Sequence, residues 1–257
     1  MMSEIHLKAA VNNGGFLPET GMNANTSNAF ELDRNTLENQ IYKELKNRIV
    51  SVQILPGQMI SENEMANKFS VSRTPIRQAF FRLSVDGLLE IMPQRGALVS
   101  FISKRKVREA QRIREVLELE AFTEAAGKWD KTALESITLL EKAEMLITKQ
   151  EEEIKKLDYY EFTKLDEEFH DCIIQFSGNL SLAYIVKEMR SHLNRLRYIE
   201  LQEAHHEATA ILQHRALLLA IKNKDDDGVS RILIDHLKLV ENFREFIFKK
   251  RAELFID

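Results

Sequence analysis

The chain has 257 residues, of which 44% are hydrophobic and 30% are charged, proportions that are ordinary for a soluble globular protein. Its formal net charge of −4 excludes a chain that is basic throughout, and no uninterrupted apolar run reaches the ~20 residues that a membrane span needs. We expect a cytoplasmic protein without a secretory signal, because no basic region precedes an apolar core at the N-terminus and the single Cys172 cannot form an internal disulfide.

Residues 1–35 show no sustained hydrophobic period and include stretches rich in asparagine and glycine, so we predict a flexible tail. Charge is unevenly distributed beyond it. Residues 36–103 carry eight lysines and arginines against six acids, whereas the rest of the chain is acidic. A basic part joined to an acidic part fits DNA binding by the basic part only.

The slightly basic part is predicted to contain three short helices. The first opens at Thr36, the second is capped by Ser61 with Glu64 completing a capping box, and Ser72 can cap the third. The apolar face of the first helix consists of Ile41, Leu45 and Ile49.

Two strands, 88–91 and 97–101, follow these helices and are joined by a turn, which predicts a hairpin. Three helices and a hairpin are the parts of a winged helix-turn-helix, whose third helix enters the DNA major groove, so we predict this domain for residues 36–103. Arginine suits such a helix because its planar fork can bind guanine or a phosphate, although two arginines alone could equally form a solvated face. The predicted DNA contacts, at the third helix and the hairpin tip, are Ser72, Arg73, Thr74, Arg77, Arg95 and Gly96.

A longer residue pattern supports DNA binding. It comprises Ile54-Leu55-Pro56-Gly57, Ser61-Glu62-Asn63-Glu64-Met65-Ala66, Val71-Ser72-Arg73-Thr74-Pro75-Ile76-Arg77-Gln78-Ala79, Asp86-Gly87-Leu88-Leu89 and Pro93-Gln94-Arg95-Gly96-Ala97-Leu98-Val99. In this order and spacing the segment resembles the GntR family of bacterial regulators. The resemblance implies that Arg73, Thr74 and Arg77 contact the operator and that Gly96 contacts the DNA backbone. Asn63 stands where some members have a DNA-binding arginine, and it can still donate a hydrogen bond.

From residue 104 onward the pattern is helical almost throughout, so the fold class is mainly α. We predict that residues 104–257 form an all-α antiparallel bundle of about six helices. Their expected positions are 104–127, 131–156, 158–177, 181–203, 205–223 and 226–254.

Three of these helices carry polar residues at the centre of an apolar face. Asp166 and His170 are spaced i,i+4, while His214 and His236 lie equally far before and after the turn at Asp225 and so at the same height of an antiparallel pair. Burying a carboxylate beside three imidazoles is costly unless a cation compensates it. The set predicts one divalent transition metal, for which zinc fits best and nickel or manganese are also plausible.

Histidines outside this set serve as a comparison, because a single buried histidine is more often a satisfied core residue than a ligand. We interpret His192, His205 and His206 as structural or solvated, since they lie opposite or at the edge of an apolar stripe.

The bundle sequence resembles the FCD-type effector domain of the FadR subfamily of GntR regulators. The residues that carry the resemblance are Arg114-x-x-Leu117-Glu118, Leu165-Asp166-x-x-Phe169-His170, Ser177-Gly178-Asn179-x-x-Leu182, His214 with Ala220-Ile221, and His236-Leu237. It implies that Asp166, His170, His214 and His236 bind one metal, and that a small carboxylate, often a sugar acid or hydroxy acid, binds at that metal. An anionic effector needs a cationic partner, for which the candidates are Arg114, then Arg197, then Arg195.

These observations predict a homodimeric, effector-responsive transcription regulator that is not an enzyme and binds an inverted-repeat operator, since a two-fold protein implies a two-fold site. Three alternatives remain. The signal could be the metal itself or a long acyl-CoA, as in the fatty-acid branch of this subfamily. The same histidines and aspartate could also activate water in a metal-dependent enzyme.

Overall fold

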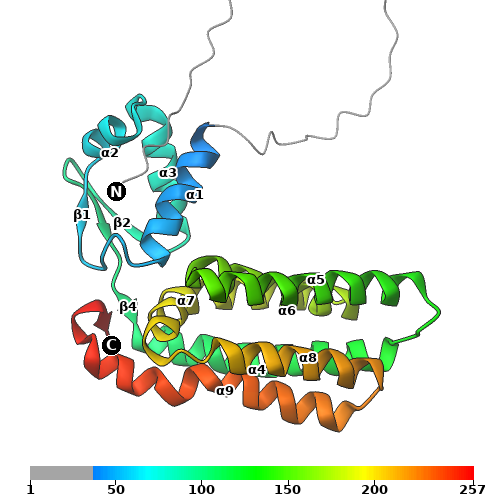
Figure 1. Cartoon of the computed structure of the whole chain (residues 1–257). Helices are drawn as coiled ribbons and strands as arrows, with labels where there is room; N and C mark the ends of the chain where they lie inside the picture. Colours follow the sequence, from blue (N-terminus) through cyan, green and yellow to red (C-terminus); the bar gives the residue numbers. More distant parts are fainter. Residues whose placement is uncertain (1–36) are drawn as a thin grey trace, which may run out of the picture. The chain divides into compact units, whose positions relative to one another are not determined.

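The computed structural model describes residues 37–257, so the tail expected in residues 1–35 lies outside the described residues (Figure 1). The first part of the described chain consists of three helices and a small antiparallel sheet of strand order β1-β3-β2. Their bounds are α1 Leu37–Val50, β1 Met59–Ile60, α2 Glu62–Phe69, α3 Arg73–Val85, β2 Leu89–Met92 and β3 Gly96–Val99. This is a winged helix-turn-helix, as predicted.

The core of this part is built from the apolar stripes that the sequence indicates. Helices α1 and α3 pack against each other. Their fully buried residues include Leu45, Ile49, Ile76, Ala79 and Leu83. Their removal from water is the main stabilisation of so small a core.

Two local predictions have different outcomes at the helix starts. The backbone N–H of Glu64 donates to Ser61 Oγ at 3.0 Å, so the Ser61 cap is confirmed. Ser72 occupies the N-cap position of α3, but its side chain makes no capping hydrogen bond, so the expected cap there is wrong.

The two-stranded hairpin gains a third strand that the sequence does not indicate. Met59 and Ile60 pair with Leu98 and Ala97 across β3. A strand of two residues is too short to show a period of two.

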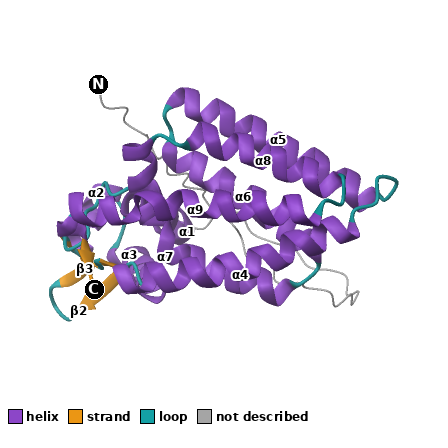
Figure 2. Ribbon diagram, turned by 90° about the horizontal axis from the view of Figure 1, so that it is seen from below, coloured by secondary structure: helices purple, strands orange, loops and turns teal. Residues whose placement is uncertain are grey.

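Six helices form the remainder, in agreement with the predicted all-α bundle (Figure 2). Their bounds are α4 Lys104–Lys128, α5 Leu134–Lys156, α6 Tyr159–Ser177, α7 Leu180–Ala204, α8 Glu207–Lys222 and α9 Asp226–Lys250. Helix α4 packs against α6, α7, α8 and α9, and α5 packs against α6 and α8, so that α4 touches most of the other bundle helices. None of the helices in residues 37–257 is long and apolar enough to cross a bilayer.

Caps explain where several bundle helices begin. The side chains of Asp158, Asn179 and Asp225 accept hydrogen bonds from the first-turn backbone of α6, α7 and α9. Gly178 ends α6 with a φ of 90°, a left-handed conformation that glycine adopts without strain.

The last predicted helix, 226–254, is too long. Helix α9 ends at Lys250 and a 3-10 turn follows at Ala252–Leu254. The chain then forms β5 (Phe255–Ile256), which pairs in parallel with β4 (Ile102–Ser103). The apolar period continues through this segment because Leu254 and Phe255 are buried in a cluster with Ile247 and Phe248 of α9 and with residues distant in the sequence, such as Ile102.

Candidate metal centre and DNA-binding surface

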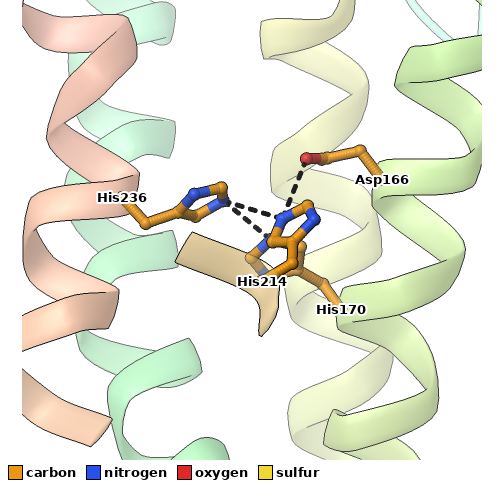
Figure 3. A group of neighbouring side chains, drawn as sticks. All are labelled: Asp166, His170, His214 and His236. Carbon is orange, nitrogen blue, oxygen red and sulfur yellow. Dashed lines mark hydrogen bonds and ion pairs between the residues drawn. The ribbon is translucent and has the colours of Figure 1, made fainter. Parts of the chain in front are cut away.

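Four side chains converge inside the bundle, and they are the four that the sequence indicates (Figure 3). Asp166 and His170 come from α6, His214 from α8 and His236 from α9. One nitrogen or carboxylate oxygen from each lies within 4.8 Å of the others, and all four residues are buried.

The separations between these atoms fit one small ion. The Nε2 atom of His236 lies 3.0 Å from Nε2 of His170 and 3.3 Å from Nε2 of His214. Nε2 of His214 lies 3.4 Å from Oδ1 of Asp166. Two atoms that each bind zinc at its usual distance, in a tetrahedral arrangement, lie roughly 3.3 Å apart.

The other ring nitrogen of each histidine, Nδ1, forms a hydrogen bond that orients the ring. Nδ1 of His170 donates to Glu118 Oε2 at 2.6 Å, and Nδ1 of His214 donates to Gln150 Oε1 at 2.9 Å. Nδ1 of His236 donates to Oε1 of Gln213 at 3.0 Å. In the neutral rings this leaves three Nε2 lone pairs facing one another, with the Asp166 carboxylate beside them.

That arrangement is repulsive unless a cation lies between the lone pairs. Burial lowers the pKa of His170 to about 4, although Glu118 opposes the shift, and burial with repulsion from His214 holds the pKa of His236 well below its usual range. Burial alone would raise the pKa of Asp166, but the charge of Arg197, with smaller contributions from His214 and His170, outweighs burial and holds this pKa well below its ordinary value. Asp166, His170 and His236 are therefore held in the deprotonated state that a metal requires.

No role at this site was predicted for the three residues that accept hydrogen bonds from the histidines, Glu118, Gln150 and Gln213. Glu118 occurs in the sequence analysis only as part of the FCD resemblance, without a role. Gln150 has a detectable signal, since it is a fully buried polar residue within the apolar stripe of α5, and its Nε2 donates to the Leu165 carbonyl oxygen at 3.1 Å. Gln213 has no comparable signal, because it is only partly buried.

The three candidate effector arginines differ in their surroundings. Arg114 Nε donates to Glu118 Oε1 at 2.7 Å, and Arg197 Nη2 donates to Asp166 Oδ2. Arg114 Nη2 and Arg197 Nη1 have no hydrogen-bond partner among the described residues, and both arginines line a small cavity beside Asp166.

Arg195 does not line this cavity. Its guanidinium donates to the backbone carbonyl oxygens of Ser100 and Phe101, between β3 and β4. Two residues along a helix correspond to a rotation of about 200°, so Arg195 and Arg197 leave α7 on nearly opposite sides. The contacts of Arg195 therefore do not support the effector role expected of it.

One histidine of the comparison set lies near the site. His206 precedes α8 and lines the same cavity, although its place at the edge of an apolar stripe predicted a structural or solvated residue. The Nδ1 atom of His205 instead lies within hydrogen-bond distance of the Tyr159 hydroxyl oxygen, at 3.1 Å. His192 is half-buried and lies outside this cavity.

A second concave surface, in the winged helix-turn-helix, gathers most of the predicted DNA-binding residues. It has a volume of about 410 Å³ and is lined by residues that include Asn63, Arg73, Arg77, Arg95 and Gly96. Ser72 and Thr74 are exposed at the start of α3 but do not line it.

The two arginines of α3 are available for DNA. The side chains of Arg73 and Arg77 are 59% and 67% exposed. Both pair with Glu62, at 3.4 and 3.1 Å, and the hydrogen bond from Arg77 lowers the pKa of that carboxyl. Phosphate can replace such an exposed carboxylate partner.

The backbone geometry requires a glycine at position 96. Its φ is 104°, and a Cβ at this position would overlap the carbonyl oxygen of Ile60 in the neighbouring strand. The close approach of β1 therefore requires glycine here, independently of any contact with DNA.

Comparisons with known proteins define the class. Residues 37–99 match the family described as bacterial regulatory proteins, gntR family, and residues 109–239 match the FCD domain. The chain belongs to the GntR family of DNA-binding transcription regulators and carries an FCD domain. Regulators with this helix-turn-helix bind DNA operators and usually dimerise.

Individual relatives span most of the chain. It is 29% identical over 217 residues to the HTH-type transcriptional repressor RspR of Escherichia coli (strain K12), which covers 84% of this chain and 92% of that protein. It is 30% identical over 187 residues to the gluconate operon transcriptional repressor of Bacillus subtilis (strain 168), covering 71% and 74%. The solved structure of E. coli McbR/YncC shares the fold, with a TM-score of 0.67 at 21% identity, covering 84% of this chain and 99% of that one.

Proposed function

We propose that this protein is an effector-responsive regulator of the FadR subfamily, in which residues 36–103 bind DNA and residues 104–257 bind the effector and form a homodimer. The observation that carries the proposal is the buried group of one aspartate and three histidines in a chain that also presents an exposed DNA-binding helix. A homodimer implies an operator with inverted-repeat symmetry.

In this proposal one divalent metal, with zinc first and nickel or manganese next, is held by Asp166, His170, His214 and His236. The metal would supply a Lewis-acidic centre for a ligand oxygen and would link α6, α8 and α9. The residues of this chain orient the site: Glu118, Gln150 and Gln213 fix the histidine rings through their Nδ1 atoms.

The proposed effector is a small carboxylate, such as a sugar acid or hydroxy acid. Arg114 Nη2 and Arg197 Nη1 are unpaired cationic donors beside the metal ligands, and such donors suit a carboxylate. A relative named for the gluconate operon supports a sugar acid as one candidate. Because the relatives are regulators, we propose that the protein binds the effector without converting it chemically.

Effector control would operate as a population shift, in which the effector favours one arrangement of the protein over another. Its effect on DNA can be no larger than its difference in affinity for the two arrangements.

The test is the metal content of protein purified without chelator or nickel column, for the parent, Asp166→Ala, His214→Ala and the control His205→Ala. About one metal per chain is expected in the parent and the control, and little in the other two. Gel-shift assays with genomic fragments at low salt test DNA binding separately.

Metal-free parent protein under these conditions would contradict the metal site and favour an acyl-CoA or another effector that needs no metal. Failure to bind any genomic fragment would contradict the regulator assignment.

A further inference from the structure

One carboxyl group next to the proposed effector site has no partner. Glu200, on α7, is 0% exposed, and neither of its oxygens has a hydrogen-bond partner among the described residues. It lines the same cavity as Arg114, Arg197 and His206. A buried carboxyl without hydrogen bonds is costly, so a group retained in this state indicates a partner that arrives from elsewhere.

We propose that Glu200 recognises a hydroxyl group of the effector, so that the site takes hydroxy acids and discriminates against the corresponding acids without the hydroxyl. The inference rests on the proposed function, and it names a specificity-determining residue that neither the sequence analysis nor the metal-ligand set includes.

The cavity lining holds two kinds of unpaired group, and together they fit such a ligand. Arg114 Nη2 and Arg197 Nη1 are unpaired donors and suit the carboxylate end of an acid. Glu200 and the unpaired Nδ1 atom of His206 offer hydrogen-bonding capacity for a polar, non-carboxylate part of the same molecule. An acid with only an alkyl chain would leave both of these groups unsatisfied.

The state of Glu200 fits a hydroxyl. Burial raises its pKa to about 8, although the charges of Arg197 and Arg244 oppose the shift. At pH 7 the Glu200 carboxyl is therefore neutral, and a neutral carboxyl can both donate to and accept from a hydroxyl group.

The volume of the cavity limits the size of a ligand that can enter without moving side chains. It measures about 20 Å³, which is room for about one water molecule. A hydroxy acid must displace side chains when it enters. Its affinity therefore depends on whether the polar groups of the cavity lining form hydrogen bonds again in the complex. That dependence makes an unsatisfied carboxyl a strong penalty against the wrong acid.

The experiment uses isothermal titration calorimetry on the full chain at pH 7 after its metal content and gel-shift activity have been measured. The ligands are matched acids: malate against succinate, lactate against propionate, and gluconate against hexanoate. Aspartate against succinate tests an ammonium group in place of the hydroxyl. The variants are Glu200→Leu, Glu200→Gln and the control Glu203→Leu, which changes the same residue type one turn later, where the side chain pairs with Lys250.

At least one hydroxy acid is expected to bind the parent roughly tenfold or more tightly than its matched acid. Glu200→Leu should reduce that ratio to near one with little change for the matched acid. Glu200→Gln, which keeps a donor and an acceptor, should retain most of the preference, and Glu203→Leu should retain all of it. Thermal melting of each variant verifies that it folds.

An unchanged ratio in folded Glu200→Leu overturns the assignment, as does equal binding within every pair. Preference for aspartate, lost in Glu200→Gln, shows recognition of an ammonium ion and also overturns it. These results leave the proposed function intact, whereas a protein that contains no metal and binds no acid overturns both.

Discussion

Glu118 is a fully buried carboxylate that contacts two buried arginines and a proposed metal ligand. It accepts hydrogen bonds from Arg114 Nε and Arg190 Nη2, both at 2.7 Å, and from His170 Nδ1. Attraction from both arginines overcomes the effect of burial and holds the pKa of Glu118 well below its ordinary value. One carboxylate therefore balances the cations of α4 and α7 and also orients a proposed metal ligand.

Glu118→Gln should weaken metal binding by about tenfold to a hundredfold, because an amide is a poorer partner for the His170 N–H. It should also lower the free energy of unfolding by about 3 kcal/mol, because the buried Arg114 loses its ion pair and Arg190 keeps only the one with Asp171. Zinc competition with a chromophoric chelator and urea denaturation measure the two effects. Glu115→Gln, on the same helix, is the control, and equal zinc affinity in both variants would contradict the orienting role.

The pH dependence of stability should report on Glu200. Its folded-state pKa of about 8 exceeds the value of an exposed glutamate, so its contribution is fully present below about pH 4.5 and is lost as the pH rises through 8. Glu200→Gln removes this loss. Its stability relative to the parent should therefore grow between pH 5 and pH 8, by up to about 1.4 kcal/mol for each pH unit. Urea denaturation at pH 5, 6.5 and 8 measures this, and a constant difference would show that Glu200 is ionised in the folded protein.

At the scale of single helices, α3 presents different arginines in different directions. Arg77 is exposed and pairs with Glu62, next to the hairpin tip. Arg82 instead lies over the Tyr42 ring of α1, 3.9 Å from its centroid, and near Glu38. Within the same helix, Arg77 is therefore the proposed DNA contact, whereas Arg82 packs against α1.

Arg77→Ala should reduce operator affinity by tenfold or more, since a good arginine contact to a base is worth ~1–3 kcal/mol. Arg82→Ala should reduce it by less than about threefold, because its side chain faces α1. Gel shifts at one fixed salt concentration make the comparison. If Arg82→Ala has the larger effect in folded protein, α3 contacts DNA through a different face.

Local periodicity explains which elements could be predicted. The bundle helices follow from apolar stripes and from caps such as Asp158 and Asn179, all of which lie within a few residues of the element they define. Strands β1, β4 and β5 have two residues each and depend on partners far along the chain, so no local pattern reveals them.

The same reasoning applies to the site. The four proposed ligands lie at the centres of apolar faces, where polar residues are conspicuous. Glu200 could not be recognised in this way, because its significance lies in the absence of partners, and that absence is a property of how α7, α8 and α9 pack. Gln213 is similar, since only the geometry brings it to His236.

For the whole molecule, α7 contacts two places that a regulator must connect. Arg197 and Glu200 line the cavity beside the proposed metal site, and Arg195 holds the carbonyl oxygens of Ser100 and Phe101 after the winged helix-turn-helix. A rotation or shift of α7 on effector binding would therefore move the segment that follows the wing.

Arg195→Ala should leave the affinity for a bound acid within about twofold but reduce the effect of that acid on operator affinity by about fivefold or more, a typical size for coupling between sites. Calorimetry with the acid and gel shifts with and without it give the two quantities. Gln202→Ala, an exposed position on α7, is the control. Unchanged coupling in Arg195→Ala would mean that the signal travels by another route.

The pairing of β4 with β5 has a consequence for the connection between the two halves of the chain. Backbone hydrogen bonds fix Ile102 and Ser103 against Phe255 and Ile256, so this stretch has lost the conformational entropy that a flexible tether keeps. The strand that fixes it follows α9, the helix that carries His236. We therefore expect a substitution that breaks the pairing of β4 with β5 to loosen the connection between the DNA-binding half and the bundle.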